Sequence, residues 1–110
     1  MPYEDEFLEH VVDLLRPMGG ILCKKLFGGY ALCRNDLAFA LVFEGEVYFK
    51  VDDKTRERYA ARGSRPMTYQ KQGKTITISN WSVPGDVMED EELFLQWAED
   101  ALQAAKSRRR

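Results

Sequence analysis

Apolar residues recur at helical spacing near both ends of the chain, which predicts an amphipathic helix at each end. The N-terminal stripe consists of Phe7, Leu8, Val11, Val12 and Leu15. We expect this helix to end before Pro17, because the residue before a proline avoids helical angles. The C-terminal stripe consists of Leu93, Phe94, Trp97, Ala98, Ala101, Leu102 and Ala105. Asp90 stands where it can cap the first turn of that second helix.

Between these helices the apolar positions follow the two-residue period of β-strands. The expected strands are 22–33, 38–43, 47–51, 67–72 and 74–81. The first of them is interrupted by Gly28 and Gly29, where we expect a bulge, a bend or a close backbone approach, since such a glycine pair inside a strand commonly marks one of these. Arg34-Asn35-Asp36, Glu44-Gly45-Glu46 and Gly73 carry turn chemistry and separate neighbouring strands.

The strand at 38–43 is apolar on both faces. Strict alternation places Phe39, Leu41 and Phe43 on one face. It places Ala38, Ala40 and Val42 on the other. This pattern predicts a central strand, whose second face is covered either by a helix of the same chain or by a partner subunit in a homodimer.

A further helix is expected after residue 51, where Asp52 or Asp53 can cap it and Gly63 can end it. Its residues are mostly charged, so we expect it at the periphery. The resulting order is helix, three strands, helix, two strands, helix. It predicts an α+β fold, with a mostly antiparallel five-stranded sheet and helices packed against it. We expect one domain over residues 1–110, with a core at about 7–105 and a basic tail at 106–110.

Charge excludes a polycation that coats nucleic acid, since the 110 residues carry a net charge of −2. Residues 1–107 carry −5, because the chain ends in Arg108-Arg109-Arg110. These three arginines are candidate basic residues for contact with a partner. Direct nucleic-acid binding would need them together with further cations such as Arg56, Arg58, Arg62 and Arg65. Against an acidic body, we expect no such binding by this chain alone.

The sequence offers little for metal, cofactor or membrane chemistry. Cys23, Cys33 and His10 are the only cysteines and histidine, and their spacing fits no zinc site, so we expect reduced thiols and no cofactor. No apolar run reaches the roughly twenty residues that cross a bilayer, and the N-terminus is acidic, so we expect a cytoplasmic protein without a membrane segment.

Nucleophile–base signatures are likewise missing from the sequence, so we expect no enzyme. The alternative is a small enzyme or ligand-binding domain whose polar cleft is lined by Tyr48, Lys50, Asp52 and Tyr69.

Three ordered stretches carry a family resemblance. They are Lys24-Lys25-Leu26-Phe27-Gly28-Gly29-Tyr30-Ala31-Leu32, then Val47-Tyr48-Phe49-Lys50-Val51-Asp52 continuing to Gly63-Ser64-Arg65-Pro66-Met67-Thr68-Tyr69, and finally Trp81-Ser82-Val83-Pro84 followed by the last apolar stripe. In this order the chain resembles the N-terminal domain of the TfoX/Sxy family, bacterial proteins linked to the regulation of natural competence.

The resemblance implies the order α-β-β-β-α-β-β-α, similar to secretion-chaperone folds. Full-length members carry a second, C-terminal domain and resemble co-activators that work with the cyclic-AMP receptor protein. We therefore expect a stand-alone single-domain member. Its expected role is that of a non-enzymatic regulatory module with protein partners, including the transcription machinery.

Lys24, Lys25, Phe27, Gly28 and Gly29 have two interpretations. Backbone N–H groups beside the glycines can cradle an anion, with the lysines adding charge. Alternatively, the glycines only shape the strand and Phe27 belongs to the core; the lysines would point to opposite faces. Lys50, in the second stretch, is a further candidate for the interaction motif.

Overall fold

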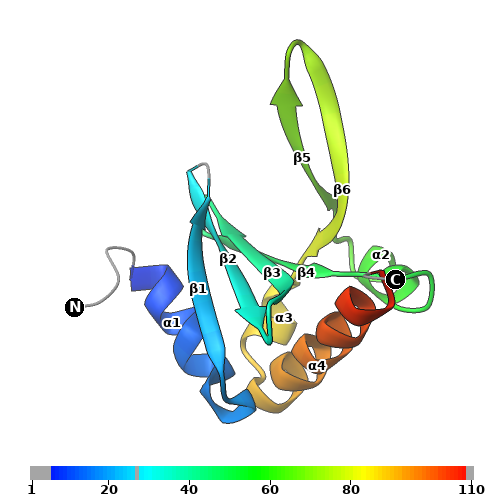
Figure 1. Cartoon of the computed structure of the whole chain (residues 1–110). Coiled ribbons are helices and arrows are strands. Elements are labelled where there is room, and N and C mark those ends of the chain that lie inside the picture. Colours follow the sequence, from blue (N-terminus) through cyan, green and yellow to red (C-terminus); the bar gives the residue numbers. More distant parts are fainter. Residues whose placement is uncertain (1–5, 27, 109–110) are drawn as a thin grey trace.

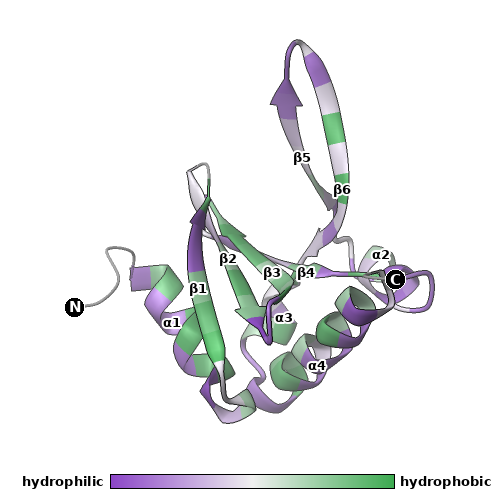
Figure 2. Cartoon of the chain, viewed as in Figure 1, coloured by the Kyte–Doolittle hydropathy of each residue, from purple (hydrophilic) through white to green (hydrophobic). Residues whose placement is uncertain are grey.

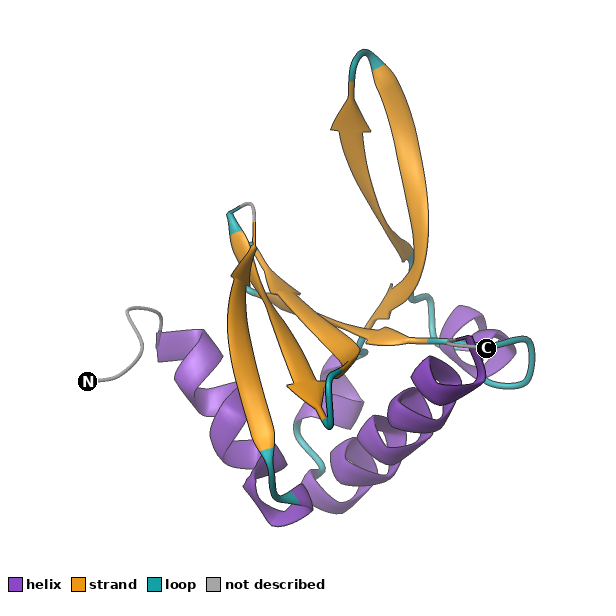
Figure 3. Cartoon of the chain, viewed as in Figure 1, coloured by secondary structure: helices purple, strands orange, loops and turns teal. Residues whose placement is uncertain are grey.

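The computed structural model describes residues 6–26 and 28–108 (Figures 1 and 3). Its helices are α1 (Glu6–Leu15), α2 (Arg56–Ala61), α3 (Gly85–Met88) and α4 (Glu91–Arg108), with a 3-10 turn, η1 (Arg16–Met18), after α1. Its strands are β1 (Ile21–Leu26), β2 (Gly29–Arg34), β3 (Leu37–Phe43), β4 (Glu46–Lys50), β5 (Pro66–Lys71) and β6 (Lys74–Ser82). They form one sheet in the order β1-β2-β3-β4-β6-β5, and all neighbours are antiparallel.

The predicted α+β class and antiparallel sheet are confirmed, but the sheet has six strands instead of five. Of the features expected at the glycine pair, the close backbone approach is confirmed, since a Cβ on Gly29 would lie 2.5 Å from the carbonyl oxygen of Val42. A bulge or a bend within one strand is wrong, because the chain reverses there: Leu26 pairs with Gly29, so β1 and β2 form a tight hairpin. Gly28 has φ +64, a left-handed value that such a short turn requires and glycine adopts without strain. Phe27 lies outside the described residues.

The helices α1, α3 and α4 lie on one side of the sheet (Figures 1 and 3). α4 packs across β3 and β4, and α1 packs beside it. The β5–β6 hairpin projects away from the rest of the molecule, because only its foot is attached: Asn80, Trp81 and Ser82 of β6 pair with β4. The fold is thus two layers, a sheet and one set of helices, with a protruding β-ribbon.

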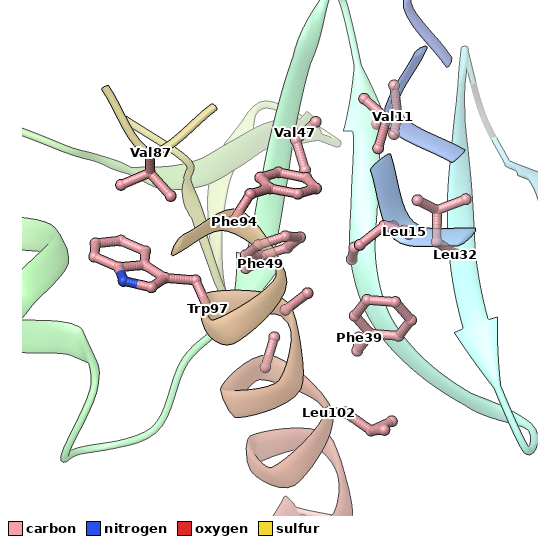
Figure 4. Close-up of a cluster of buried hydrophobic side chains, with 14 of the residues drawn as sticks. Val11, Leu15, Leu32, Phe39, Val47, Phe49, Val87, Phe94, Trp97 and Leu102 are labelled. Carbon is pink, nitrogen blue, oxygen red and sulfur yellow. The ribbon is translucent and has the colours of Figure 1, made fainter. Parts of the chain in front are cut away.

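The core lies between the sheet and the helices, as the two apolar stripes predicted. Phe49 is fully buried, and its ring centroid lies 5.2 Å from that of Phe94 on α4 and 6.4 Å from that of Phe39 on β3 (Figure 4). From α1, Leu8, Val11 and Leu15 are fully buried. Each large side chain contributes about 1.5–3 kcal/mol by leaving water, so these contacts hold both helices on the same face.

β3 departs from the strict alternation that the sequence predicted. Leu32 pairs with Ala40 whereas Cys33 pairs with Ala38, so Phe39 is an additional residue in a β-bulge. Phe39 and its neighbour Ala40 are both buried, at 0% and 1% exposure. Phe39 therefore joins the core instead of sharing a face with Leu41, and the prediction for its side is wrong.

The helix after β4 is short and charged as expected, yet Tyr59 anchors it in the core at 1% exposure. The Tyr59 ring lies 4.5 Å from that of Trp97 on α4, and the guanidinium of Arg58 lies 4.6 Å from the same Trp97 ring. The helix lies at the periphery as expected, with four of its six residues exposed, but Tyr59 ties it to the core.

Aspartates stand before two of the helices, as expected. Of the two candidates before α2, Asp52 organises the turn: its Oδ1 accepts hydrogen bonds from the backbone N–H groups of Lys54 and Thr55. Asp90 caps α4 as predicted, accepting from the N–H of Leu93 at 3.1 Å. The segment at Pro84-Gly85 opens the short helix α3, whose Val87 is fully buried.

Candidate functional site

The alternation of β4 separates the two sides of the sheet. Phe49 is buried beneath the helices, whereas its neighbour Tyr48 lies half-buried on the opposite side, which we call the open face. Tyr48 pairs with Leu41, and Leu41 pairs with Ala31. Lys24 on β1 pairs with Ala31 in turn. Because paired residues of neighbouring strands point to the same side of a sheet, the open face extends from β4 to the edge strand β1.

Large hydrophobic side chains are exposed on this open face. Leu22 and Leu26 stand two residues on either side of Lys24 and share its face, and they are 58% and 43% exposed. Leu41 and Phe43 on β3 are half-buried. Hydrophobic stretches of β1 and β3 are visible in Figure 2. A water-exposed apolar surface rimmed by polar groups is typical of an interaction site.

The β5–β6 ribbon is attached beside this open face, where Ser82 of β6 pairs with Tyr48. Tyr69 of β5 pairs with Ile76 and is 42% exposed. The pairing of β5 with β6 has a register shift between Pro66 and Thr68, so simple alternation does not carry the open face out to Tyr69 and Ile76. Among the described residues the exposed large hydrophobics are thus Leu22 and Leu26 on the open face and Tyr69 on the ribbon.

A polar depression of about 460 Å³ lies on the open face, where the ribbon joins the sheet. It is lined by Phe43, Glu44, Glu46, Tyr48, Gly63, Arg65, Pro66, Met67, Thr68 and Ser82. Sequence reasoning singled out Tyr48 and Arg65 among them and missed the others. Their spacing along the chain carries no common pattern, because three separate segments contribute to the depression: residues 43–48, residues 63–68 and Ser82.

Tyr48 is the residue of the depression whose pKa is clearly shifted. Its hydroxyl donates a hydrogen bond to Glu46 Oε2 at 2.8 Å. Burial raises the pKa of Tyr48 to about 12, and this hydrogen bond and the negative charges of Glu46 and Glu44 act in the same direction. At neutral pH the phenol is therefore a hydrogen-bond donor and a poor general base.

Ser64 and Ser82 fix the wall of the depression. Their hydroxyl oxygens lie 2.9 Å apart, and Ser64 Oγ also donates to the backbone carbonyl of Ser82. The backbone N–H of Arg65 donates to Ser82 Oγ at 3.3 Å, and the N–H of Ser82 donates to the carbonyl of Arg65 at 2.9 Å. These bonds attach the segment after α2 to the foot of the ribbon, so the wall is built from backbone as well as side chains.

The residues of the glycine motif do not converge on one spot. Lys24 lies on the open face and Lys25 on the helix-facing side, and both are exposed. Gly29 is packed against β3: a Cβ there would lie 2.5 Å from the carbonyl oxygen of Val42. The observed roles of Gly28 and Gly29 are thus conformational, in the turn and in the close approach of β2 to β3.

The cleft considered from the sequence is assembled only in part. Tyr48 lines the depression, and Lys50 lies next to it on the same face of β4. Tyr69 instead lies out on the ribbon. Asp52 serves the turn before α2; burial would raise the pKa of its carboxyl, but hydrogen bonds from Thr55 and Lys54 outweigh burial and hold that pKa below its usual value.

The arginines considered for nucleic-acid contact are largely engaged within the chain. Arg58 pairs with Asp100 at 2.6 Å and Arg62 pairs with Asp86, and both guanidinium groups also lie over Trp97. Arg56 pairs with Asp53 at 3.1 Å and Arg65 lines the depression. Arg108 is the last residue of α4, and Arg109 and Arg110 lie outside the described residues.

Candidate metal ligands and thiols can be located in the part of the chain that is described. No group of three or more His, Cys, Asp or Glu side chains that could hold a metal ion occurs within residues 6–26 and 28–108. Cys23 and Cys33 are free thiols. Nor does any described helix have the length and apolarity needed to span a membrane.

Comparison with known proteins agrees with the resemblance seen in the sequence. The sequence model of the TfoX N-terminal domain family matches residues 13–105 of this chain. Protein Sxy of Escherichia coli (strain K12) is 26% identical over 93 residues, which cover 84% of this chain and 44% of that protein. The chain therefore spans less than half the length of this relative. Since the family model covers nearly the whole chain, the protein belongs to the TfoX N-terminal domain family.

Proposed function

We propose that this chain is a non-enzymatic, cytoplasmic regulatory module that binds a protein partner through the open face of its sheet. The observation that carries the proposal is the exposure of two large hydrophobic side chains, Leu22 and Leu26, on that one face. Helices cover the other face completely enough to bury Phe49 and Phe94. Leaving apolar area in water is unfavourable, and a partner that covers it recovers about 25 cal/mol per Å².

Membership of the TfoX N-terminal domain family supports a role in transcription regulation, with competence as the process that the resemblance implies. The partners we propose are RNA polymerase or the cyclic-AMP receptor protein. The match to protein Sxy of Escherichia coli supports the same assignment.

The test measures binding of the purified chain to purified RNA polymerase and to the cyclic-AMP receptor protein by biolayer interferometry. Leu22→Asp and Leu26→Asp place a charge on the open face and, at exposed positions, leave folding intact. We expect them to weaken binding at least tenfold. The control Gln103→Ala changes an exposed position on α4 and should bind like the wild type. Equal binding by all variants, or no binding by the wild type, contradicts the proposal.

A homodimer that buries the open face is the second arrangement the same observation supports, since a two-fold dimer would cover both copies at once. Sedimentation equilibrium of the wild type and of Leu22→Asp distinguishes the two. A concentration-dependent dimer that Leu22→Asp abolishes supports self-association, whereas a monomer at all concentrations excludes it.

A ligand-binding domain is the second candidate function, favoured by the polar depression around Tyr48 and Arg65. A carboxylate or phosphate would find a cation in Arg65 and a phenolic donor in Tyr48. Glu44 and Glu46 on the same rim oppose an anion, so we rank this function below the protein-binding role. A thermal-shift screen of anionic metabolites, repeated with Arg65→Ala, tests it; no shift with the wild type rejects it.

A further inference from the structure

The β5–β6 ribbon lies in a basic stretch of an otherwise acidic chain. Between Glu57 and Asp86 the sequence has no acidic residue and five basic ones, Arg58, Arg62, Arg65, Lys71 and Lys74. Since the whole chain carries −2, the remaining residues carry −7. Arg58 and Arg62 are held in ion pairs, whereas no ion pair among the described residues includes Lys71 or Lys74.

Lys71 and Lys74 lie directly opposite each other at the tip of the ribbon. They flank the turn formed by Gln72 and Gly73, whose φ values of 52° and 77° are both left-handed, and both lysines are exposed. Directly opposed residues of paired strands have Cβ atoms about 5 Å apart, and like charges in such a pair are destabilising. The tip therefore presents two cations at one point of the surface, and anions bound there would relieve their repulsion.

The opposite side of the ribbon is polar and uncharged. It consists of two cross-strand pairs, Thr68 with Thr77 and Gln70 with Thr75. Gln70 Nε2 donates a hydrogen bond to Thr75 Oγ1 at 2.8 Å. Amide and hydroxyl groups both donate and accept hydrogen bonds. Residues 68–75 are all exposed, so a ligand can reach these groups.

The projection of the ribbon separates its tip from the acidic body of the molecule (Figure 1). The depression that contains Glu44 and Glu46 reaches along β5 only as far as Thr68. Lys71 lies three residues beyond Thr68, which is about 10 Å along an extended strand. Because the Debye length is about 8 Å at physiological salt, the carboxylates at the foot of the ribbon are largely screened from the tip.

We propose that the β5–β6 ribbon is an arm that binds duplex DNA, lying in the major groove with its polar side toward the base edges. Lys71 and Lys74, on flexible four-carbon stems, then reach the phosphates that border the groove. The major groove is about 12 Å wide and admits a two-stranded β-ribbon. Threonine and glutamine are among the side chains that hydrogen-bond to base edges there. This site goes beyond the proposed protein-binding role, which rests on the open face, and it uses none of the arginines considered from the sequence.

The composition of the tip favours a nucleic acid over a protein or a membrane. The core of a protein interface is apolar and rich in aromatic side chains. Within residues 68–75 only Tyr69 is aromatic, and all the others are polar, positively charged or glycine. A surface that enters a membrane likewise needs several apolar side chains. Protein–DNA interfaces are polar and positively charged, which is the chemistry of this tip.

The experiment measures binding of the full chain to a fluorescein-labelled DNA duplex of 20 base pairs by fluorescence anisotropy, between 20 and 200 mM NaCl. We expect binding that weakens as salt is raised, because phosphate contacts release counterions. The duplex should bind at least threefold more tightly than a single strand of the same length, which has no groove. Amide resonances of residues 68–77 should shift in ¹⁵N spectra, with those of α1 unchanged.

Lys71→Gln combined with Lys74→Gln should weaken binding of the duplex at least tenfold at 20 mM NaCl. The slope of log K against log salt should become shallower by about 2, since each phosphate contact contributes about 0.9. The matched control is Lys24→Gln combined with Lys54→Gln, which removes two exposed cations away from the ribbon. It should bind the duplex like the wild type.

Lys74→Glu distinguishes lost binding from lost folding. It places a carboxylate opposite Lys71, so thermal denaturation should show stability equal to or greater than that of the wild type. Binding of the duplex should nevertheless fall at least tenfold. Leu22→Asp, on the open face, should bind the duplex like the wild type.

No binding of the duplex at 20 mM NaCl, equal losses in the ribbon variant and its matched control, or equal binding of single and double strands would overturn the inference. Tighter binding of polyglutamate or of phosphatidylglycerol vesicles than of the duplex also overturns it, and assigns the tip to an acidic protein or a membrane. Since the open face takes no part in this site, each of these outcomes leaves the proposed protein-binding function standing.

Discussion

A Cβ atom on Gly29 would lie only 2.5 Å from the carbonyl oxygen of Val42, so this position on β2 admits no side chain without a shift of the neighbouring strand. The contact is with backbone, which cannot rotate away as a flexible side chain can. The ring of Phe43 adds a second contact at 3.1 Å. The glycine is therefore explained by the packing of β2 on β3.

Gly29→Ala should lower the free energy of unfolding by about 1–3 kcal/mol, the usual cost of overpacking. Gly28→Ala should lower the free energy of unfolding by about 1–2 kcal/mol for a different reason, because Gly28 has a left-handed φ of +64. Asparagine tolerates that conformation, so Gly28→Asn should recover most of the loss, whereas Gly29→Asn should not.

Urea denaturation measures these differences, with Gly85→Ala as the control. Gly85 opens α3, has no left-handed φ, and a Cβ there meets nothing within 4 Å. Its substitution should leave stability unchanged or slightly raised. If Gly28→Asn and Gly29→Asn are equally tolerated, the packing explanation of Gly29 is wrong.

Arg58 should contribute to stability rather than to nucleic-acid binding. Its guanidinium lies 4.6 Å from the Trp97 ring centre and pairs with Asp100 at 2.6 Å. Arg58→Ala should lower the free energy of unfolding by about 1–2 kcal/mol, combining a cation–π contact with a partly exposed ion pair. The free energy of unfolding of Arg58→Lys should fall between those of the wild type and Arg58→Ala, because lysine keeps the charge but loses the planar guanidinium group.

The comparison for this prediction is Arg56→Ala. Arg56 pairs with Asp53 at the surface, away from Trp97, so its removal should cost less than about 0.5 kcal/mol. Urea denaturation followed by tryptophan fluorescence gives both values. Equal effects of Arg56→Ala and Arg58→Ala would show that the stacking on Trp97 is without energetic consequence.

The raised pKa of Tyr48 predicts that the free energy of unfolding falls at alkaline pH. The folded protein holds its pKa near 12, above the ordinary value of 10, so between these values the unfolded chain releases a proton that the folded chain retains. Stability is therefore complete below pH 10 and declines as the pH rises toward 12. Tyr48→Phe should reduce this decline.

Unfolding in urea at pH 8, 10 and 11 measures the effect. Tyr69→Phe is the matched control, because it removes an exposed phenol from the ribbon. Tyr59 also has a pKa raised by burial, so part of the alkaline decline should persist in Tyr48→Phe. The same pH slope in the wild type and in Tyr48→Phe would contradict the role assigned to the Glu46 hydrogen bond.

The two cysteines should remain reduced and react slowly. Cys23 pairs with Leu32 and Leu22 pairs with Cys33, so the two thiols occupy opposite faces of the sheet. Burial, and to a lesser degree the neighbouring Cys33, raises the pKa of Cys23, which lowers its reactive thiolate fraction. Cys33 is only 3% exposed.

A thiol-reactive chromophore should therefore modify the native protein slowly, and both thiols should react quickly in urea. The native rate should rise with pH, as the thiolate forms. In Cys33→Ala, the slow reaction of Cys23 should remain. Formation of an intramolecular disulfide under mild oxidation, with the fold unchanged, would show that the assigned faces are incorrect.

Local periodicity was enough to predict much of the fold. The stripes of α1 and α4 depend on residues three and four apart on one helix, and Leu8, Val11, Phe94 and Trp97 are buried accordingly. The candidate site was largely hidden, because Leu22 and Leu26 have the same sequence signature as buried strand residues. Their exposure depends on which face the helices cover, and no local pattern encodes it.

The amino-acid order by itself determined the α+β class, the antiparallel strands and the two core helices, because each follows from spacing within a single segment. Only the tertiary structure decided that Gly28 turns the chain, that Phe39 bulges into the core and that Arg58 lies on Trp97. It alone left one sheet face open. The turn and the bulge depend on how neighbouring strands pair, and the contact of Arg58 with Trp97 joins residues far apart in the chain. None of these follows from spacing within a single segment, because each is settled by packing between segments.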